Sequence, residues 1–144
     1  MAYVVATAEA FASTDALREI WAVEDEVAAG TALLNGTRAG VTYTPSGGHT
    51  ISKTVGPYTI SGVPDGGESL SDLEVSIATD GSYEFAITGA TSGTANGTRV
   101  YAVVAAGLIT SLTLTSTSNT LWGVVNNPSD YDAAGAVSCV KIGV

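Results

Sequence analysis

The chain has 144 residues, a length that fits one domain and can bury a hydrophobic core without disulfides or metals. Charged residues make up 13% of it, about half the usual share of roughly 25%, so its polar surface must come largely from Thr, Ser, Asn and Gly. The net charge is −9, whereas binding to nucleic acid or to an anionic membrane depends on clustered Lys and Arg. We therefore expect neither nucleic acid nor a membrane among its partners.

Residues 1–18 are predicted to form an extended N-terminal arm with weak local structure, because their apolar residues make no sustained helical stripe. This segment also lacks the basic start of a secretory signal. Tyr3, Val4, Val5 and Phe11 are apolar enough to need a partner surface, so we expect the arm to become ordered on binding. The remaining residues, 19–144, are expected to form one β-rich domain.

From residue 19 onward, short β-branched runs alternate with Gly, Pro and Asn, which is typical of an all-β domain. Tight turns are predicted at Asn35-Gly36 and at Ala105-Ala106-Gly107, and Asp80-Gly81 is predicted to join two strands into a hairpin. The expected strands are Glu19–Val23, Ala32–Leu34, Gly40–Tyr43, Thr50–Val55, Tyr58–Ile60, Leu73–Ile77, Tyr83–Ile87, Arg99–Val104, Leu108–Leu114, Leu121–Val125 and Ala136–Ile142.

The sequence shows no constellation of residues for catalysis, and we expect no enzyme, no cofactor and no metal site. No GxSxG, HExxH, P-loop or GxGxxG motif is present. Cys139 is the single cysteine, so it can form neither an intramolecular disulfide framework nor a Cys-based zinc site. It is predicted to be a small buried residue of a strand. His49, the single histidine, is predicted to lie in a solvated Gly- and Ser-rich loop.

Two acidic clusters are candidate functional features. Glu24, Asp25 and Glu26 form a triplet that lacks the glycine and the oxygen-ligand spacing of a calcium loop, so a solvated turn is favoured. Asp130 and Asp132 follow an Asn- and Pro-containing loop. Paired carboxylates can hydrolyse glycosides, but the sequence shows no aromatic-lined cleft around this pair.

Several short motifs follow one another from Val27 onward. They are Ala28–Leu34, Ala39–Val41, Asp72–Ile77, Asp80–Phe85, Thr94–Tyr101, Gly107–Thr110, Leu121–Val125 and Ala136–Ile142. In this ordered series, residues 27–144 resemble the small capsid cement, or head decoration, proteins of tailed bacteriophages. The chain departs from the family's pattern in two places. Residues 44–62 look like an insertion, and residues 1–18 look like an extended arm.

The resemblance implies a small single-domain β-barrel or β-sandwich of the β-tulip-like kind. It also implies a homotrimer on the outer surface of the virion's icosahedral capsid, at three-fold and quasi-three-fold positions, where it would bridge neighbouring major capsid protein subunits. An acidic protein suits this external location better than the DNA-facing interior. The candidates for contact with the capsid are Tyr3, Val4, Val5, Phe11, Glu24, Asp25, Glu26, Asp130 and Asp132.

Two other classes of function remain open at this point. The first is a carbohydrate-binding or adhesin-like domain, which would use exposed aromatic residues such as Trp21, Trp122 and Tyr131, although Trp122 lies in an apolar run typical of a core. The second is another phage structural part, such as a tail-tube or head–tail joining protein.

Overall fold

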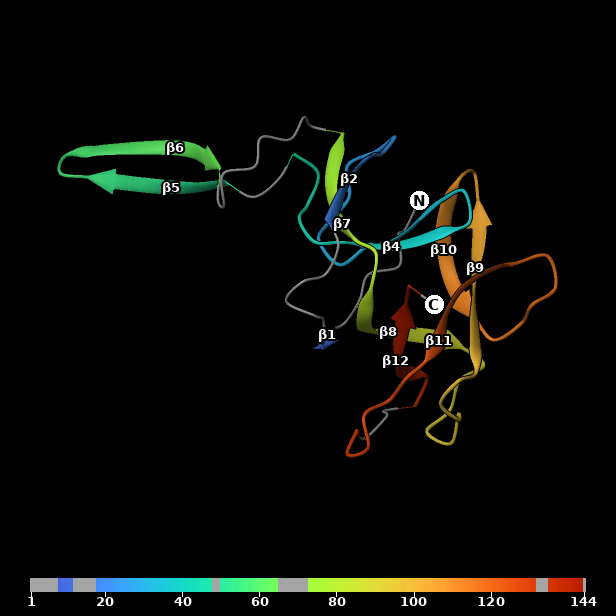
Figure 1. The fold of residues 1–144 in the computed structure, drawn as a ribbon. Coiled ribbons are helices and arrows are strands. Elements are labelled where there is room, and N and C mark those ends of the chain that lie inside the picture. The colour runs from blue at the N-terminus through green and yellow to red at the C-terminus, as the bar shows by residue number, and fades with distance from the viewer. Residues whose placement is uncertain (1–7, 12–17, 48–49, 65–72, 132–134, 144) are drawn as a thin grey trace.

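Every regular element that the described residues form is a β-strand (Figure 1). The computed structural model of the chain describes residues 8–11, 18–47, 50–64, 73–131 and 135–143. Within these ranges there is no helix that could span a membrane. The described strands are β1 (Ala8–Phe11), β2 (Arg18–Ala22), β3 (Ala32–Asn35), β4 (Arg38–Thr42), β5 (Thr50–Val55), β6 (Tyr58–Pro64), β7 (Glu74–Ala78), β8 (Gly81–Thr88), β9 (Arg99–Ala105), β10 (Leu108–Thr113), β11 (Thr120–Val125) and β12 (Val137–Ile142).

Five strands close into a barrel in the order β8-β10-β9-β11-β12, and β12 returns to pair with β8. The β8–β10 pairing, at Ile87 and Thr88, is parallel, and the other four pairings of the ring are antiparallel. Strand β1 pairs with β8 over Ser82–Glu84. Because the ring is closed, its backbone hydrogen-bonding groups are used within the molecule rather than offered at an edge. The predicted all-β fold with a small barrel is confirmed.

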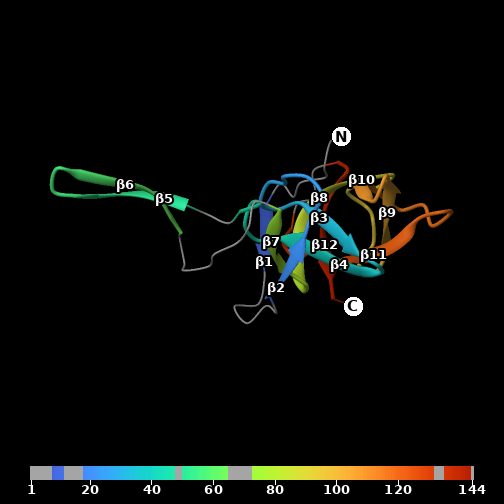
Figure 2. The ribbon, with the colours of Figure 1, turned by 90° about the horizontal axis from the view of Figure 1, so that it is seen from above.

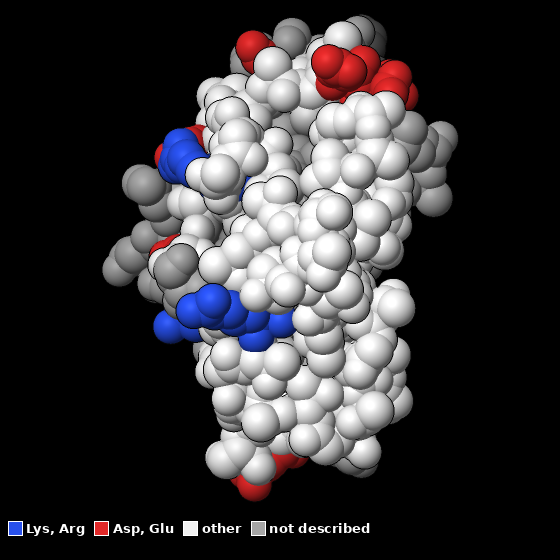
Figure 3. Space-filling view, turned by 90° about the vertical axis from the view of Figure 1, so that its right-hand side faces the viewer, with Lys and Arg blue, Asp and Glu red and all other residues white. Residues whose placement is uncertain are grey.

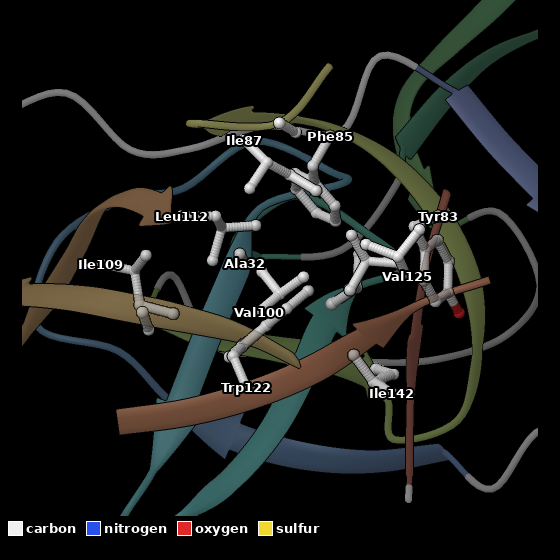
Figure 4. Packing of buried hydrophobic residues seen from close by; sticks show 14 of the residues in the cluster. Ala32, Tyr83, Phe85, Ile87, Val100, Ile109, Leu112, Trp122, Val125 and Ile142 are labelled. Atoms are coloured by element: carbon white, nitrogen blue, oxygen red, sulfur yellow. The ribbon is translucent and has the colours of Figure 1, made fainter. Parts of the chain in front are cut away.

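The barrel is filled by apolar side chains from every one of its strands (Figure 4). Phe85 and Trp122 pack edge to face, with ring centroids 5.2 Å apart and planes at 87°. Trp122 is 3% exposed, and its Nε1 donates a hydrogen bond to the backbone oxygen of Leu33, 3.2 Å away in the neighbouring sheet. Cys139 is also buried in β12. The predicted core positions of Trp122 and Cys139 are therefore confirmed.

A second sheet of four strands, in the order β2-β7-β4-β3, packs beside the barrel, with β3 against β10 and β4 against β11. One face adds Ala32, Val41 and Ala78 to the barrel core. The other face carries a second apolar cluster made of Trp21, Val27, Leu33, Val75 and Ile77. This cluster depends on Gly40, because a Cβ there would lie 2.5 Å from Cγ2 of Ile77 and 2.9 Å from the Trp21 ring.

Strands β5 and β6 pair with each other as a separate two-stranded hairpin. Gly56 and Pro57 join them, and Gly56 has a φ of +60°, as the first central residue of a type II′ turn requires. In both views the hairpin extends away from the rest of the molecule (Figures 1 and 2). It falls largely within residues 44–62, the segment expected from the sequence to be an insertion.

All eleven expected strands are present, with boundaries that differ by a few residues. One prediction is wrong: Asp80-Gly81 does not close a hairpin, because β7 belongs to the four-stranded sheet and β8 to the barrel. The chain turns there, with a φ of +100° at Gly81, and passes from one sheet to the other. The predicted turns at Asn35-Gly36 and Ala106-Gly107 do close hairpins.

The strand β1 lies inside the segment expected to be an arm. Residues 8–11 pair with β8, and Arg18 begins β2. Residues 1–7 and 12–17 lie outside the described residues, as does His49. A β-strand at 8–11 was not expected from the sequence, because Ala8, Glu9 and Ala10 have low strand propensity and only the pairing with β8 favours this conformation.

Candidate functional site

The sequence-predicted contact residues fall in different parts of the molecule. Tyr3, Val4, Val5 and Asp132 lie outside the described residues. Phe11 ends β1, in register with Ser82 of the barrel. Nothing in the described part of the chain therefore brings the apolar residues of the arm and the acidic residues into one site.

The acidic residues are exposed at two separate places. Glu24, Asp25 and Glu26 lie in the loop after β2, and Asp130 lies in a turn after β11. These two segments are at opposite ends of the molecule in Figure 1. Among the described residues, no group of three or more His, Cys, Asp or Glu side chains is placed to hold a metal ion.

The loop that carries the acidic triplet is fixed to the four-stranded sheet by buried hydroxyl groups. Thr42 Oγ1 accepts a hydrogen bond from the Thr31 backbone N–H at 2.8 Å and donates one to the Ala28 carbonyl at 2.7 Å. The Thr31 hydroxyl donates to the same carbonyl, also at 2.7 Å. Directly after the triplet, the Val27 backbone N–H donates to Ser46 Oγ. The triplet is thus presented by a segment with defined backbone contacts.

Beside this loop lies a groove that sequence reasoning did not anticipate. Its volume is about 350 Å³, and Glu24 stands among its lining residues. We call it the β2–β3 groove; the apolar side chains on its lining are Trp21, Val23, Val27, Leu33, Leu34 and Leu108. Trp21, Val27 and Leu33 among them are buried. They come from β2, the loop after it, β3 and the start of β10, so they are far apart in the chain. No local motif could have revealed the groove.

A wider hollow lies between the β3–β4 turn and β11, with a volume of about 530 Å³. Arg38, on its lining, is already engaged: both of its terminal nitrogens donate to the Glu19 carboxylate. Trp21 Nε1 donates to the same carboxylate at 2.9 Å, and the guanidinium lies 5.9 Å from the centre of the Trp21 ring. The hydrogen bonds from Arg38 and then from Trp21 lower the pKa of Glu19, and Glu19 in turn raises the pKa of Arg38.

The three aromatic residues considered for sugar stacking do not form an exposed platform. Trp21 and Trp122 are buried in two different apolar clusters. Tyr131 is half-buried, and burial followed by its hydrogen bond with Glu84 raises the pKa of its hydroxyl. Burial, together with the charge of Glu84, also raises the pKa of the neighbouring Cys139 thiol. These aromatic residues act as packing groups in the described structure.

The β5–β6 hairpin has one apolar face without a partner in the described structure. Val55, Tyr58 and Ile60 are 59%, 73% and 55% exposed, and Val55 is directly opposite Tyr58 in the ladder. We call these three residues the hairpin's apolar face. Thr54 and Thr59, which alternate with them, are opposite each other on the other face, with their hydroxyl oxygens 3.2 Å apart. Between residues 54 and 60 the hairpin therefore has one apolar side and one hydroxyl side.

The side of the molecule that faces away from the hairpin is mostly uncharged. Figure 3 shows it as largely white, with Lys and Arg in two places and Asp and Glu near its two ends and beside the basic residues.

Comparison of the chain with protein-family models, with curated proteins and with solved structures found no match.

Proposed function

We propose that this protein is a capsid decoration, or cement, protein. In this proposal it binds the outer surface of a bacteriophage head as a homotrimer, at three-fold and quasi-three-fold positions, and has no enzymatic activity. The observation that carries the proposal is the projecting hairpin, whose apolar face is exposed beside a closed barrel. Exposed apolar surface concentrated on one element is characteristic of a protein–protein contact.

The resemblance of residues 27–144 to the cement family supports the same function. Reinforcement of a shell needs many copies, each of which buries surface across a joint between major capsid subunits. The protein would stabilise the assembled shell by mass action, because it binds the shell and not its dissociated subunits. Each copy would contribute about a few kcal/mol of binding free energy, which is within the usual range for a single interface. The total stabilisation of the shell becomes large when many copies must be lost together.

The acidic residues give this contact a polar component. Glu24, Asp25, Glu26 and Asp130 are exposed in a chain of net charge −9 and would face basic residues of the major capsid protein. Salt screens exposed charge pairs, so the proposed binding weakens as the ionic strength rises. Charge reversal at the triplet, for example Asp25→Lys, should therefore lower the number of copies bound to the shell. It should also make the binding less dependent on salt concentration.

The decisive experiment compares particles with and without the protein. Both are heated in parallel, and release of the packaged DNA is followed with a fluorescent dye. Decorated particles should release DNA at a higher temperature, and a reconstruction should place this chain at three-fold positions. Equal release temperatures, or subunits in rings of five or six, would refute the proposal.

A glycan array on the same protein separates the proposal from an adhesin-like role. The buried state of Trp21 and Trp122 disfavours stacking against a sugar. Specific glycan binding together with equal release temperatures would replace the cement proposal with the carbohydrate-binding one.

A further inference from the structure

Two Asn-Gly pairs in the chain, Asn35-Gly36 and Asn96-Gly97, lie in different structural settings. In such a pair the backbone nitrogen of the glycine can attack the side-chain carbonyl carbon of the asparagine. Glycine favours this reaction because it has no Cβ to obstruct the ring that forms. The dipeptide alone gives both pairs the same reactivity, but the fold holds one asparagine in place and leaves the other exposed.

Asn96 is held at the groups that would react. Its Nδ2 donates a hydrogen bond to the Asn127 carbonyl at 3.0 Å, and its Oδ1 accepts one from the Asn127 backbone N–H at 2.7 Å. The attacking nitrogen, that of Gly97, donates to the Val125 carbonyl at 2.8 Å. Ring closure at this pair would break these hydrogen bonds, so the folded structure opposes the reaction.

Asn35 and Gly36 are exposed at the end of the four-stranded sheet. Asn35 is the last residue of β3, the end strand in the sheet order, and it pairs with Arg38 across a turn made of Gly36 and Thr37. Residues 35–38 are all exposed, and a Cβ on Gly36 would meet no atom within 4 Å. The ladder ends here, where local opening needs little free energy. The pair can therefore rotate until the reacting atoms are about 3–3.5 Å apart, as attack requires.

We propose that Asn35 deamidates spontaneously in the folded protein, whereas Asn96 is protected. The Gly36 nitrogen forms a bond to Cγ of Asn35, the Cγ–Nδ2 bond breaks, and the side-chain nitrogen leaves as ammonia, with the proton lost by the Gly36 amide. The cyclic imide then takes up one water molecule. Opening at Cγ gives aspartate, and opening at the main-chain carbonyl gives isoaspartate, in which the backbone runs through the former side chain. This modification does not depend on the proposed function.

The modification changes the contact between the β3–β4 turn and β2. It adds one negative charge to a chain of net charge −9 and places it directly opposite Arg38 in the ladder. The Arg38 guanidinium binds the Glu19 carboxylate, which also accepts a hydrogen bond from Trp21. A carboxylate at position 35 would compete with Glu19 for Arg38. The isoaspartate form also lengthens the backbone by one methylene, which would disturb the pairing of β3 with β4.

The test is peptide mapping of the folded full chain after incubation in a mildly alkaline buffer. Cleavage after Lys and Arg places the two asparagines in different peptides, residues 19–38 and residues 54–99. Deamidation replaces NH₂ by OH and raises the mass of a peptide by about 1 Da. We expect peptide 19–38 to gain this mass at least about tenfold faster than peptide 54–99. A sample digested before incubation corrects for deamidation during the digest.

The unfolded chain is the matched control, because it keeps both dipeptides and removes both structural settings. In concentrated guanidinium chloride the two peptides should gain mass at similar rates. Asn35→Gln lengthens the side chain, so that the five-membered ring can no longer form, and should abolish the gain in peptide 19–38.

Three results would overturn the proposal. The first is equal rates at the two sites in the folded protein, or a faster reaction at Asn96. The second is an Asn35 that stays unmodified in the folded protein while both sites react in guanidinium chloride. The third is a difference between the sites that persists in the unfolded chain, because it would then come from the sequence and not from the fold.

Discussion

The barrel and the β5–β6 hairpin use the same kind of sequence and reach opposite outcomes. In both, apolar residues alternate with polar ones along short strands. In the barrel the apolar side is enclosed, with Phe85, Ile87 and Val100 fully buried. In the hairpin Val55, Tyr58 and Ile60 are exposed. The contrast teaches that alternation identifies a face that must be covered, but not whether the cover comes from the same chain.

The largest expected effect is in the barrel core. Trp122→Ala removes the edge-to-face contact with Phe85 and the hydrogen bond to Leu33, and leaves a cavity between two sheets. We expect a loss of about 3–5 kcal/mol in the free energy of unfolding, measured by urea denaturation. Tyr58→Ala, at the most exposed of the three hairpin residues, should change the stability of the dilute monomer by less than about 0.5 kcal/mol. Equal losses at the two sites would show that the hairpin is part of the cooperative core.

The next effect concerns the hydroxyl groups that fix the acidic loop. Thr42→Val keeps the shape of the side chain but removes both the acceptor for Thr31 and the donor to Ala28. The Ala28 carbonyl keeps its bond from the Thr31 hydroxyl, but the buried Thr31 N–H is left unpaired, which should cost about 1–3 kcal/mol. Thermal unfolding can measure this loss. Thr59→Val is the matched change on the hairpin, where the hydroxyl pair is exposed, and it should cost little. A small loss at Thr42 would mean that water replaces the missing partner.

The turns allow a smaller and more local comparison. Ala106, in the β9–β10 turn, has a φ of +52°, and Gly56, in the hairpin turn, has +60°. Ala106→Asn should raise the free energy of unfolding by about 0.5–1 kcal/mol, because Asn tolerates this backbone conformation better than Ala. Gly56→Ala should destabilise the hairpin by a similar amount, about 1 kcal/mol, without changing global unfolding. Hydrogen exchange of the hairpin amides would detect this local opening.

The smallest expected effect is on the pH dependence of barrel stability. Burial raises the pKa of both Cys139 and Tyr131, so in the unfolded chain these groups ionise at lower pH than in the folded protein. Their contribution is fully present below the ordinary thiol pKa of 9.0 and is lost as the pH rises toward the folded values. Urea unfolding should therefore become easier above about pH 9, and Cys139→Ala with Tyr131→Phe should flatten this trend. If the free energy of unfolding of that double variant falls with pH as steeply as that of the wild type, other groups cause the effect.

The strands were predictable because their signal is local. Alternation and glycine-containing turns placed the eleven expected strands, including both strands of the hairpin. The pairing was harder, since Asp80-Gly81 has the composition of a hairpin turn but connects two different sheets. Which strands become neighbours depends on the packing of whole faces, such as Trp122 against Leu33, and no dipeptide contains that information.

The candidate surfaces were less predictable for the same reason. The acidic triplet was visible in the sequence, but the β2–β3 groove combines Trp21, Leu33 and Leu108 from distant segments. The ion pair of Glu19 with Arg38 joins β2 and β4, which are separated by β7 in the sheet order. The exposed state of Val55 and Tyr58 could not be inferred either, because their alternation matches that of buried strands.

Barrel closure by β12 has a consequence for the order of folding. Strand β8 lies in the middle of the chain, and its closing partner, Val137–Ile142, comes after β9, β10 and β11. A chain under synthesis cannot complete the ring until those residues have been made, and until then one edge of β8 is available to other strands. Distant pairings of this kind slow folding, typically to milliseconds or seconds. The interval before closure is therefore the period in which this protein is most exposed to aggregation, and a chaperone or a low rate of expression would help most at that stage.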